Sequence, residues 1–238
     1  TMGTKWSEII SENAMTDIND VRLIELAQEN PARFFRKMAL YMKNAIPIFN
    51  RPPEIRQWLE LDMTLPSWDE ASWVSTGEST MEETQVATGK TGYSVFSCVK
   101  VEWLDNGEAA ETTYHGASYD AETGIVTFAA QDAAGVEYSM DFYRDGAFAK
   151  ELTATQKRIL GLCVASTWDE HFFRDWLADV AKAHDRSFEA PNESQYMEKS
   201  IKKKMANRSL LNEELRKYEQ DCAYYNAFRA GNRREGFV

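Results

Sequence analysis

Hydrophobic and polar positions alternate most regularly in the middle of the chain. Val136, Tyr138, Met140 and Phe142 recur at every second position, and the apolar run of residues 125–130 precedes them. Alternation with a period of two is typical of half-buried strands, and glycine-containing turns bound both runs. The pattern predicts a β-hairpin over residues 125–143.

Two more strands are predicted ahead of that hairpin. Tyr93, Val99 and Trp103 belong to one set of alternate positions in a first strand, and residues 111–118 return as its partner. Asp105-Asn106-Gly107 between them supplies residues that tolerate the positive φ of a tight turn. The four strands together predict an antiparallel meander, whose apolar face needs helices or a second sheet to cover it.

The N-terminal pattern is helical. Asp17 or Asn19 is suited to cap a short helix, and Pro31 stands where proline best begins a helix. Pro47 and Pro52-Pro53 end that second helix, because proline lacks the backbone donor that a continuing helix needs. Its predicted apolar face consists of Phe34, Phe35, Met38, Tyr41, Met42 and Ala45.

Two helices are predicted at the C-terminal end. Thr153 and Gln156 form a capping box for the first helix, and residues 192–195 repeat this cap for the second. The second helix extends to about Phe228, and its seam positions alternate by four and three, the period of a helix packed lengthwise on another. The seam includes Lys204, Arg208, Leu211, Leu215, Tyr218, Cys222 and Tyr225. The two charged seam residues indicate either a polar partner for its first half or a bend near residues 207–209.

Residues 66–92 are predicted to be irregular. Trp68 and Trp73 lie in this stretch among Ser, Thr, Gly and Glu. A long loop with exposed tryptophans indicates either an arm that orders against a neighbouring molecule or packing on the chain's own β-domain.

These patterns predict an α+β fold in which N- and C-terminal helices pack together around a central antiparallel four-stranded β-domain. The expected parts are a helical segment over residues 1–65, a β-domain with its leading loop over residues 66–150, and C-terminal helices over residues 151–238.

Composition and charge narrow the class of protein. The 238 residues are 43% hydrophobic and 12% aromatic, which is typical of a folded chain. The net charge is −11, yet residues 199–238 carry ten basic and five acidic side chains. An acidic body with a basic tail favours head-to-tail self-association, although a merely solvated tail explains the same pattern. No leader or apolar run of about 18 residues occurs, so no membrane partner is expected.

Candidate chemical sites are weak. Gly89-Lys90-Thr91 lacks the earlier glycine and the following helix of a phosphate-binding loop. Cys163 and His171 stand roughly 12 Å apart on one helix, too far for proton transfer. The three cysteines lack metal-ligand spacing, and Asp141 with Asp145 is more typical of a turn than of a calcium site. We therefore predict no enzyme activity, no catalytic or metal-binding residues and no cofactor.

Basic residues offer the remaining candidate surface. The predicted last helix carries a basic run of Lys199, Lys202, Lys203, Lys204 and Arg208, with Arg229, Arg233 and Arg234 in its tail, and Lys199, Lys202 and Lys203 share one face. Such a run is suited to phosphate contact, and non-specific DNA binding is one interpretation. A solvated helix face or an acidic protein neighbour is the other.

Residues 124–143 resemble a hairpin found in structural proteins of tailed-phage virions. The similarity lies in a Gly-Ile-Val-Thr-Phe strand, an Ala-Ala-Gly turn and an outgoing strand that ends in Asp141-Phe142-Tyr143. The passage from Arg144 to Leu160 resembles the transition from β-domain to C-terminal helices in phage neck and connector proteins.

This resemblance implies a non-enzymatic assembly component of the virion, of neck or head-to-tail connector type, made in the host cytoplasm. It implies a homo-oligomeric ring and contacts with other virion proteins, and the expected contact residues are Trp68, Trp73, Lys202, Lys203, Arg208, Arg233 and Arg234. A tail or baseplate protein, a glycan- or peptide-binding β-domain that uses the loop aromatics, and a hydrolase with an unrecognised site are the alternatives.

Overall fold

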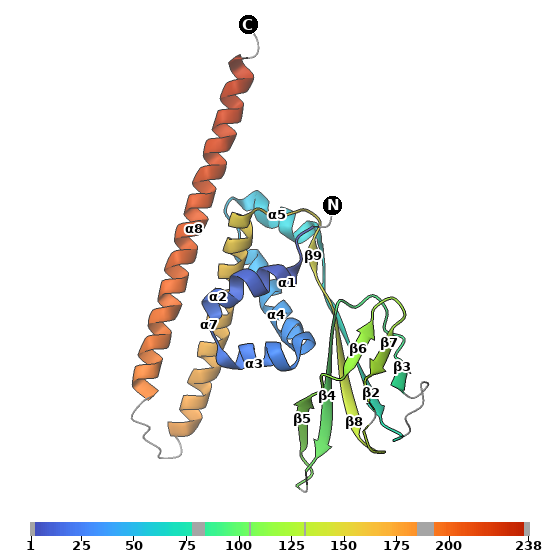
Figure 1. Ribbon diagram of the computed structural model, residues 1–238. Helices are drawn as coiled ribbons and strands as arrows, with labels where there is room; N and C mark the ends of the chain where they lie inside the picture. Colours follow the sequence, from blue (N-terminus) through green and yellow to red (C-terminus); the bar gives the residue numbers. More distant parts are fainter. Residues whose placement is uncertain (1–2, 78–83, 105, 131, 185–192, 236–238) are drawn as a thin grey trace. The chain divides into compact units, whose positions relative to one another are not determined.

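The computed structural model describes residues 3–77, 84–104, 106–130, 132–184 and 193–235, and it describes side chains outside residues 173–197, 200 and 227–235. The fold is α+β, with helices toward both ends and antiparallel sheets between them, as predicted (Figure 1).

The chain forms two compact units, each assembled from separated segments. The helical unit consists of residues 1–18, 40–63 and 148–238, and the sheet unit consists of residues 19–39 and 64–147. Residues 19–39, which belong to the predicted N-terminal helical segment, therefore fold with the strands.

The sheet unit contains two sheets and the helical segment that precedes them. Its helices are α3 (Val21–Glu29) and the first part of α4 (Pro31–Ala45). Its larger sheet has the strand order β2-β8-β4-β5, and its smaller sheet has the order β3-β7-β6. The strands are β2 (Ser67–Val74), β3 (Gln85–Ala87), β4 (Val95–Trp103), β5 (Ala109–Thr113), β6 (Ala117–Asp120), β7 (Ile125–Phe128) and β8 (Glu137–Arg144). A separate two-stranded sheet pairs β1 (Met63–Thr64) with β9 (Ala147–Phe148).

The predicted four-stranded meander is wrong. The β4–β5 hairpin is confirmed, and its turn places Gly107 at φ +80°. However, the predicted strand over residues 111–118 divides into β5 and β6, which lie in different sheets, and the predicted hairpin over 125–143 does not form. Strand β7 pairs with β3 and β6, whereas β8 pairs with β2 and β4. Alternation identified these strands but not their partners, because an apolar face can be covered by either sheet.

The predicted irregular stretch over residues 66–92 is also wrong, since it contains β2 and β3. Strand β2 alternates between half-buried and exposed residues along its whole length, in register with β8. The sequence hides this alternation, because the exposed positions include Trp68 and Val74 while the half-buried positions include Ser67 and Asp69.

Aromatic and apolar residues from the two sheets form one core. Strand β8 contributes Tyr138, Met140 and Phe142 to it, and β7 contributes Val126 and Phe128. The rings of Phe128 and Tyr138 meet edge to face at 5.0 Å between centroids. This offset geometry is favourable for aromatic pairs, so the core is held by burial and ring packing together.

The other face of the larger sheet is partly covered by α4 and holds a buried polar network. Asp141 is only 3% exposed, and it accepts a hydrogen bond from Asn30 Nδ2 at 2.7 Å. Arg33 Nε lies 3.0 Å from Asp141 Oδ2. Asn30 Oδ1 also accepts from the Arg33 backbone N–H at 3.0 Å, which caps α4. The network therefore joins the start of α4 to the central strand.

The helical unit packs both ends of the chain together. Its elements are α1 (Trp6–Ile9), the π-helical turn η1 (Ile10–Ala14), α2 (Met15–Ile18), the end of α4, the 3-10 turn η2 (Ile46–Ile48), α5 (Pro53–Leu61), α7 (Ala154–His184) and α8 (Glu193–Glu235). Helix α7 packs on η1 and buries Ile159, Leu160 and Cys163. The predicted capping box is confirmed, because Gln156 N–H donates to Thr153 Oγ1 and Thr153 N–H donates to Gln156 Oε1.

Candidate interaction surface

Helix α8 packs antiparallel along α7 through the predicted seam. Leu211 and Leu215 are 4% and 5% exposed, and the Tyr218 ring meets Phe49 edge to face at 5.4 Å. Gln156 Nε2 near the start of α7 donates to Tyr218 Oη at 2.9 Å. The helix continues without a break through residues 207–209.

The polar part of the seam also has partners in the structure. Asn207 Nδ2 donates to Asp169 Oδ2 at 2.8 Å. Burial raises the pKa of Asp169, while the hydrogen bond from Asn207 and the charges of Lys203 and Lys204 lower it. A polar first half and an apolar second half of one seam explain how Lys204 is accommodated opposite α7.

The last part of α8 extends beyond the start of α7. Tyr218 lies opposite Gln156, close to the first residue of α7, so residues from about 222 onward have passed the end of their partner helix. At about 1.5 Å per residue, the segment from Cys222 to the end of α8 is roughly 20 Å long. Tyr224 and Tyr225 on this segment are 76% and 58% exposed. We call residues 222–235 the α8 extension; α8 is drawn in orange to red in Figure 1.

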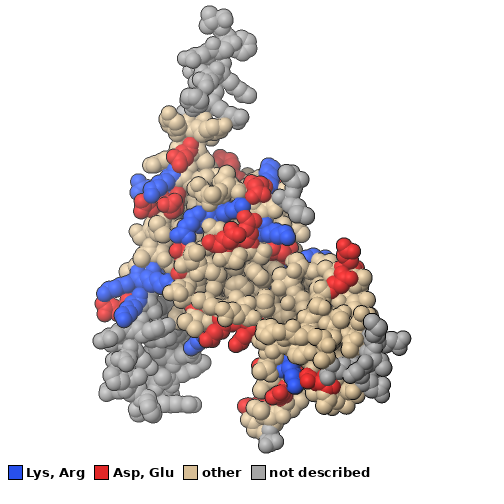
Figure 2. All heavy atoms as spheres, viewed as in Figure 1, with Lys and Arg blue, Asp and Glu red and all other residues tan. Residues whose placement is uncertain are grey.

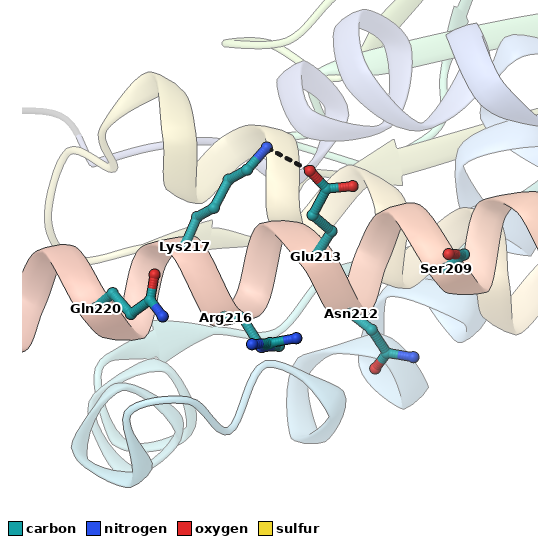
Figure 3. A pocket seen from close by; sticks show the side chains of 6 residues that line it. All are labelled: Ser209, Asn212, Glu213, Arg216, Lys217 and Gln220. Atoms are coloured by element: carbon teal, nitrogen blue, oxygen red, sulfur yellow. Dashed lines mark ion pairs between the residues drawn. The ribbon is translucent and has the colours of Figure 1, made fainter.

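A shallow hollow lies along the outer face of α8, opposite the seam. Six side chains of α8 line it: Ser209, Asn212, Glu213, Arg216, Lys217 and Gln220 (Figure 3). Lys217 Nζ pairs with Glu213 Oε1 at 2.8 Å, and this hydrogen bond lowers the pKa of Glu213. Because neighbouring opposite charges neutralise one another, this face is suited to polar protein contacts and offers no enclosed ligand site.

The predicted basic residues do not act as one group. Lys202 pairs with Glu198 at 2.6 Å, and Lys203 Nζ donates to the Ile18 carbonyl oxygen at the end of α2 at 2.5 Å. Arg208 is exposed, whereas the Arg233 and Arg234 side chains lie outside the described residues. Figure 2 shows Lys and Arg side chains interleaved with Asp and Glu on the face drawn. Lys203 thus stabilises a helix end, and Lys202 remains exposed beside an acidic neighbour.

The two predicted tryptophans point to opposite faces of β2. The Trp73 ring packs on Phe128 at 4.4 Å and on Tyr138 at 5.5 Å, so Trp73 belongs to the core. Trp68 is 41% exposed, and the Arg36 guanidinium lies 5.2 Å from its ring centroid. Because the two rings lie on opposite faces of β2, they do not form one glycan- or peptide-binding site.

A second exposed surface was not predicted from the sequence. Val74 and Trp103 are 54% and 66% exposed on the face of the larger sheet that also carries Asp141. Glu137 pairs with both Val74 and Val101 across the strands, and Trp103 Nε1 donates to Glu137 Oε2 at 3.1 Å. We call Val74, Val101, Trp103 and Glu137 the Trp103 patch. The apolar residues of the patch alternate in the sequence as the residues of a buried strand face do. The sequence pattern therefore could not reveal that α4 leaves these residues exposed.

The three cysteines differ in access, which gives a first testable prediction. Burial, with a smaller effect of Asp141, raises the pKa of Cys98 to about 12, and burial raises the pKa of Cys163. Cys222 is partly exposed on α8. At pH 8 we expect a thiol reagent to modify the partly exposed Cys222 rapidly and Cys98 much more slowly, because Cys98 is buried and little of it is present as thiolate. Peptide mass spectrometry of the native protein locates the label, and Cys222→Ser removes the fast phase; equal labelling of Cys98 would contradict the packing of the sheet unit.

Titratable side chains elsewhere have structural partners. Asp132 accepts a short hydrogen bond from Tyr138 Oη and pairs with Lys100 at 3.4 Å, and these interactions lower its pKa. Lys90, from the Gly89-Lys90-Thr91 sequence, pairs with Asp69 at 2.5 Å.

Within the described residues, no group of three or more His, Cys, Asp or Glu side chains is placed to hold a metal ion. A search of the same residues finds no helix that is long and apolar enough to span a membrane.

In comparisons with known proteins, no family model and no curated sequence matches this chain.

Proposed function

We propose that this chain is a non-enzymatic structural component of a tailed-phage particle, of neck or head-to-tail connector type, that works by oligomeric assembly. The observation that carries the proposal is the α8 extension. This helical segment is roughly 20 Å long, extends beyond the end of its partner helix α7, and exposes Tyr224 and Tyr225. Helices of this length are marginal alone in water, and exposed tyrosines are typical of contact surfaces.

The surroundings of the charged side chains favour an assembly role over a chemical one. Asp141 and Asp169 accept hydrogen bonds that join α4 to β8 and α8 to α7, and Asp132 accepts one from Tyr138 that fixes the connection before β8 to that strand. These hydrogen bonds give each of the three carboxylates a structural role. The hydrophilic outer face of α8 points to the same class, as does the resemblance of residues 144–160 to the passage into the C-terminal helices of phage neck and connector proteins; the resemblance of residues 124–143 adds no support, because that hairpin does not form.

The proposed partners are further copies of the chain in a ring and other proteins of the virion. Lys202 and Arg208 are exposed on α8, and they are suited to a non-specific contact with DNA or with an acidic protein surface. Lys203 is unsuited to that role because its ammonium group holds the Ile18 carbonyl oxygen.

Particle composition tests the proposal directly. Particles of the phage or prophage that encodes the chain are purified, and its peptides are quantified by mass spectrometry against those of the portal and major capsid proteins. We expect a fixed copy number per particle, and filled heads without tails when the gene carries an early stop codon. Purified particles that lack the chain and retain normal tails would refute a virion role.

A further inference from the structure

The face of the larger sheet that bears Asp141 is covered at one end and bare at the other. Under α4, Ser97 Oγ accepts from the Ala32 backbone N–H at 2.9 Å, and Phe35 stacks on Tyr143 at 5.7 Å. Four residues further along β8 the Trp103 patch begins, about 13 Å from Asp141 at the rise of a strand. A sheet face that carries Val74 at 54% and Trp103 at 66% exposure is the pattern of a contact surface.

The dimensions of the patch suit one helix. Val74, Glu137 and Val101 lie side by side on three neighbouring strands, so the patch is about 10 Å wide at the usual strand spacing. A helix with its side chains has about the same diameter. Within the sheet unit, α4 already packs on the adjoining part of the same face, which shows that this surface accepts a helix.

We infer that the Trp103 patch of one copy binds the α8 extension of a second copy. This inference rests on the proposed function and names the surfaces by which copies associate. The extension is a helix whose exposed residues include Tyr224 and Tyr225, and aromatic residues of this kind are enriched at the centres of interfaces.

Charge complementarity identifies a second copy as the occupant. The sequence of the α8 extension holds three arginines and one glutamate, whereas the patch has Glu137 at its centre; Glu111 on the adjoining strand β5 is already paired with Arg33 at 2.6 Å. Glu108 precedes β5 and is exposed. A basic, tyrosine-bearing helix and an acidic, tryptophan-bearing patch on the same chain form a heterologous pair. Repeated association of this kind closes into a ring when the rotation between copies permits.

The interface is expected to be weak for each pair of copies. A surface three strands wide, about 10 Å, and about 7 Å long from Val101 to Trp103 is well below the roughly 800 Å² per partner that stable complexes bury. Association is therefore expected at micromolar or higher protein concentration, and high salt is expected to reduce it by screening the opposite charges. Ring closure adds a second contact to every copy and strengthens the assembly.

Two variants of the full chain test the inference. Trp103→Glu disrupts the Trp103 patch, and Tyr224→Glu disrupts the α8 extension. The control variant Leu61→Glu introduces the same charge at a residue that is 82% exposed and lies outside both surfaces. Molar mass is measured by light scattering and sedimentation over a range of protein and salt concentrations. We expect self-association of the unmodified chain and of Leu61→Glu, and monomers for each of the other two variants.

Mixing the two variants discriminates between modes of association. Trp103→Glu keeps an intact extension and Tyr224→Glu keeps an intact patch, so their equimolar mixture is expected to form a complex of two copies and no larger one. A mixture that stays monomeric, while the unmodified chain associates, would overturn the inference in favour of like-with-like pairing. If Trp103→Glu fails to give the circular dichroism spectrum of the unmodified chain, Val74→Glu takes its place.

Failure of the inference and failure of the proposed function have different signatures. An unmodified chain that stays monomeric at every concentration, or variants that associate as it does, would overturn the inference and leave the particle measurement untouched. Absence of the chain from purified particles would instead remove the virion role.

Discussion

Replacing Gly161 with leucine is expected to lower the free energy of unfolding by about 3 kcal/mol, because α7 and η1 are in backbone contact at this residue. A Cβ atom on Gly161 would lie 2.9 Å from the carbonyl carbon of Asn13 and 3.0 Å from the backbone nitrogen of Ala14. Backbone atoms cannot rotate away as the end of a long side chain does, so α7 must move from the N-terminal segment. Chemical denaturation followed by circular dichroism measures the loss.

The smaller substitution Gly161→Ala separates the two effects at this position. Alanine gains about 1 kcal/mol of helix propensity over glycine, while the close contact costs about 1 to 3 kcal/mol, so a small net loss is expected. Ala206→Leu on an exposed position of α8 serves as the control and is expected to change stability by less than about 0.5 kcal/mol. If Gly161→Ala raises the free energy of unfolding, the backbone of η1 adjusts to the added Cβ atom without loss of stability.

The sequence indicates most helices correctly because their signals are local. Pro31 begins α4, and Thr153 with Gln156 caps α7, since both effects depend on residues within one turn. The cap of α3 was misplaced: Asp20, rather than Asp17 or Asn19, accepts from the Arg22 backbone N–H at 2.9 Å. Several neighbouring polar residues satisfy the same local rule, so the rule alone cannot choose among them.

Strand pairing could not be predicted because it depends on distant residues. Strand β8 forms hydrogen bonds with β2 and β4, and β2 precedes it by about 70 residues in the chain. The turn residues between β7 and β8 suit a hairpin, yet the two strands separate into different sheets, and Phe128 and Tyr138 pack edge to face in the core between them. Packing between sheets thus outweighs the local preference for a hairpin.

The candidate surfaces show the same division between local and distant effects. The seam of α8 follows from the spacing of Leu211, Leu215 and Tyr218, and its burial on α7 was foreseeable. The exposure of Trp103 could not be predicted, because it depends on how far α4 extends along the sheet. Trp73 illustrates the converse, since a tryptophan among polar residues proved to belong to the core.

Loss of the Asp141 carboxylate is expected to destabilise the sheet unit by about 2 to 3 kcal/mol in the variant Asp141→Ala. The substitution leaves the Asn30 amide without its acceptor and Arg33 without the carboxylate 3.0 Å away. Burial of the guanidinium acts against its charge, but Asp141 and then Glu111 outweigh that effect and raise the pKa of Arg33. Arg33 is 37% exposed and regains part of its hydration, which keeps the loss below that of a fully buried pair.

A double-mutant cycle isolates the interaction between the two charges. Asp141→Ala, Arg33→Ala and the double variant are compared by denaturant unfolding, and a coupling energy of about 1 kcal/mol or more is expected for groups in direct contact. Glu111→Ala is the matched control, because the Glu111 carboxylate is 40% exposed and its pairing with Arg33 is worth at most about 1 kcal/mol. Additive losses from Asp141 and Arg33 would mean that the ion pair adds nothing to the hydrogen bond from Asn30 and to the stacking of Phe35 on Tyr143. A coupled loss would establish that the start of α4 is fixed to the strand by charge as well as by its cap, which keeps the helix on one end of the sheet and leaves the Trp103 patch open.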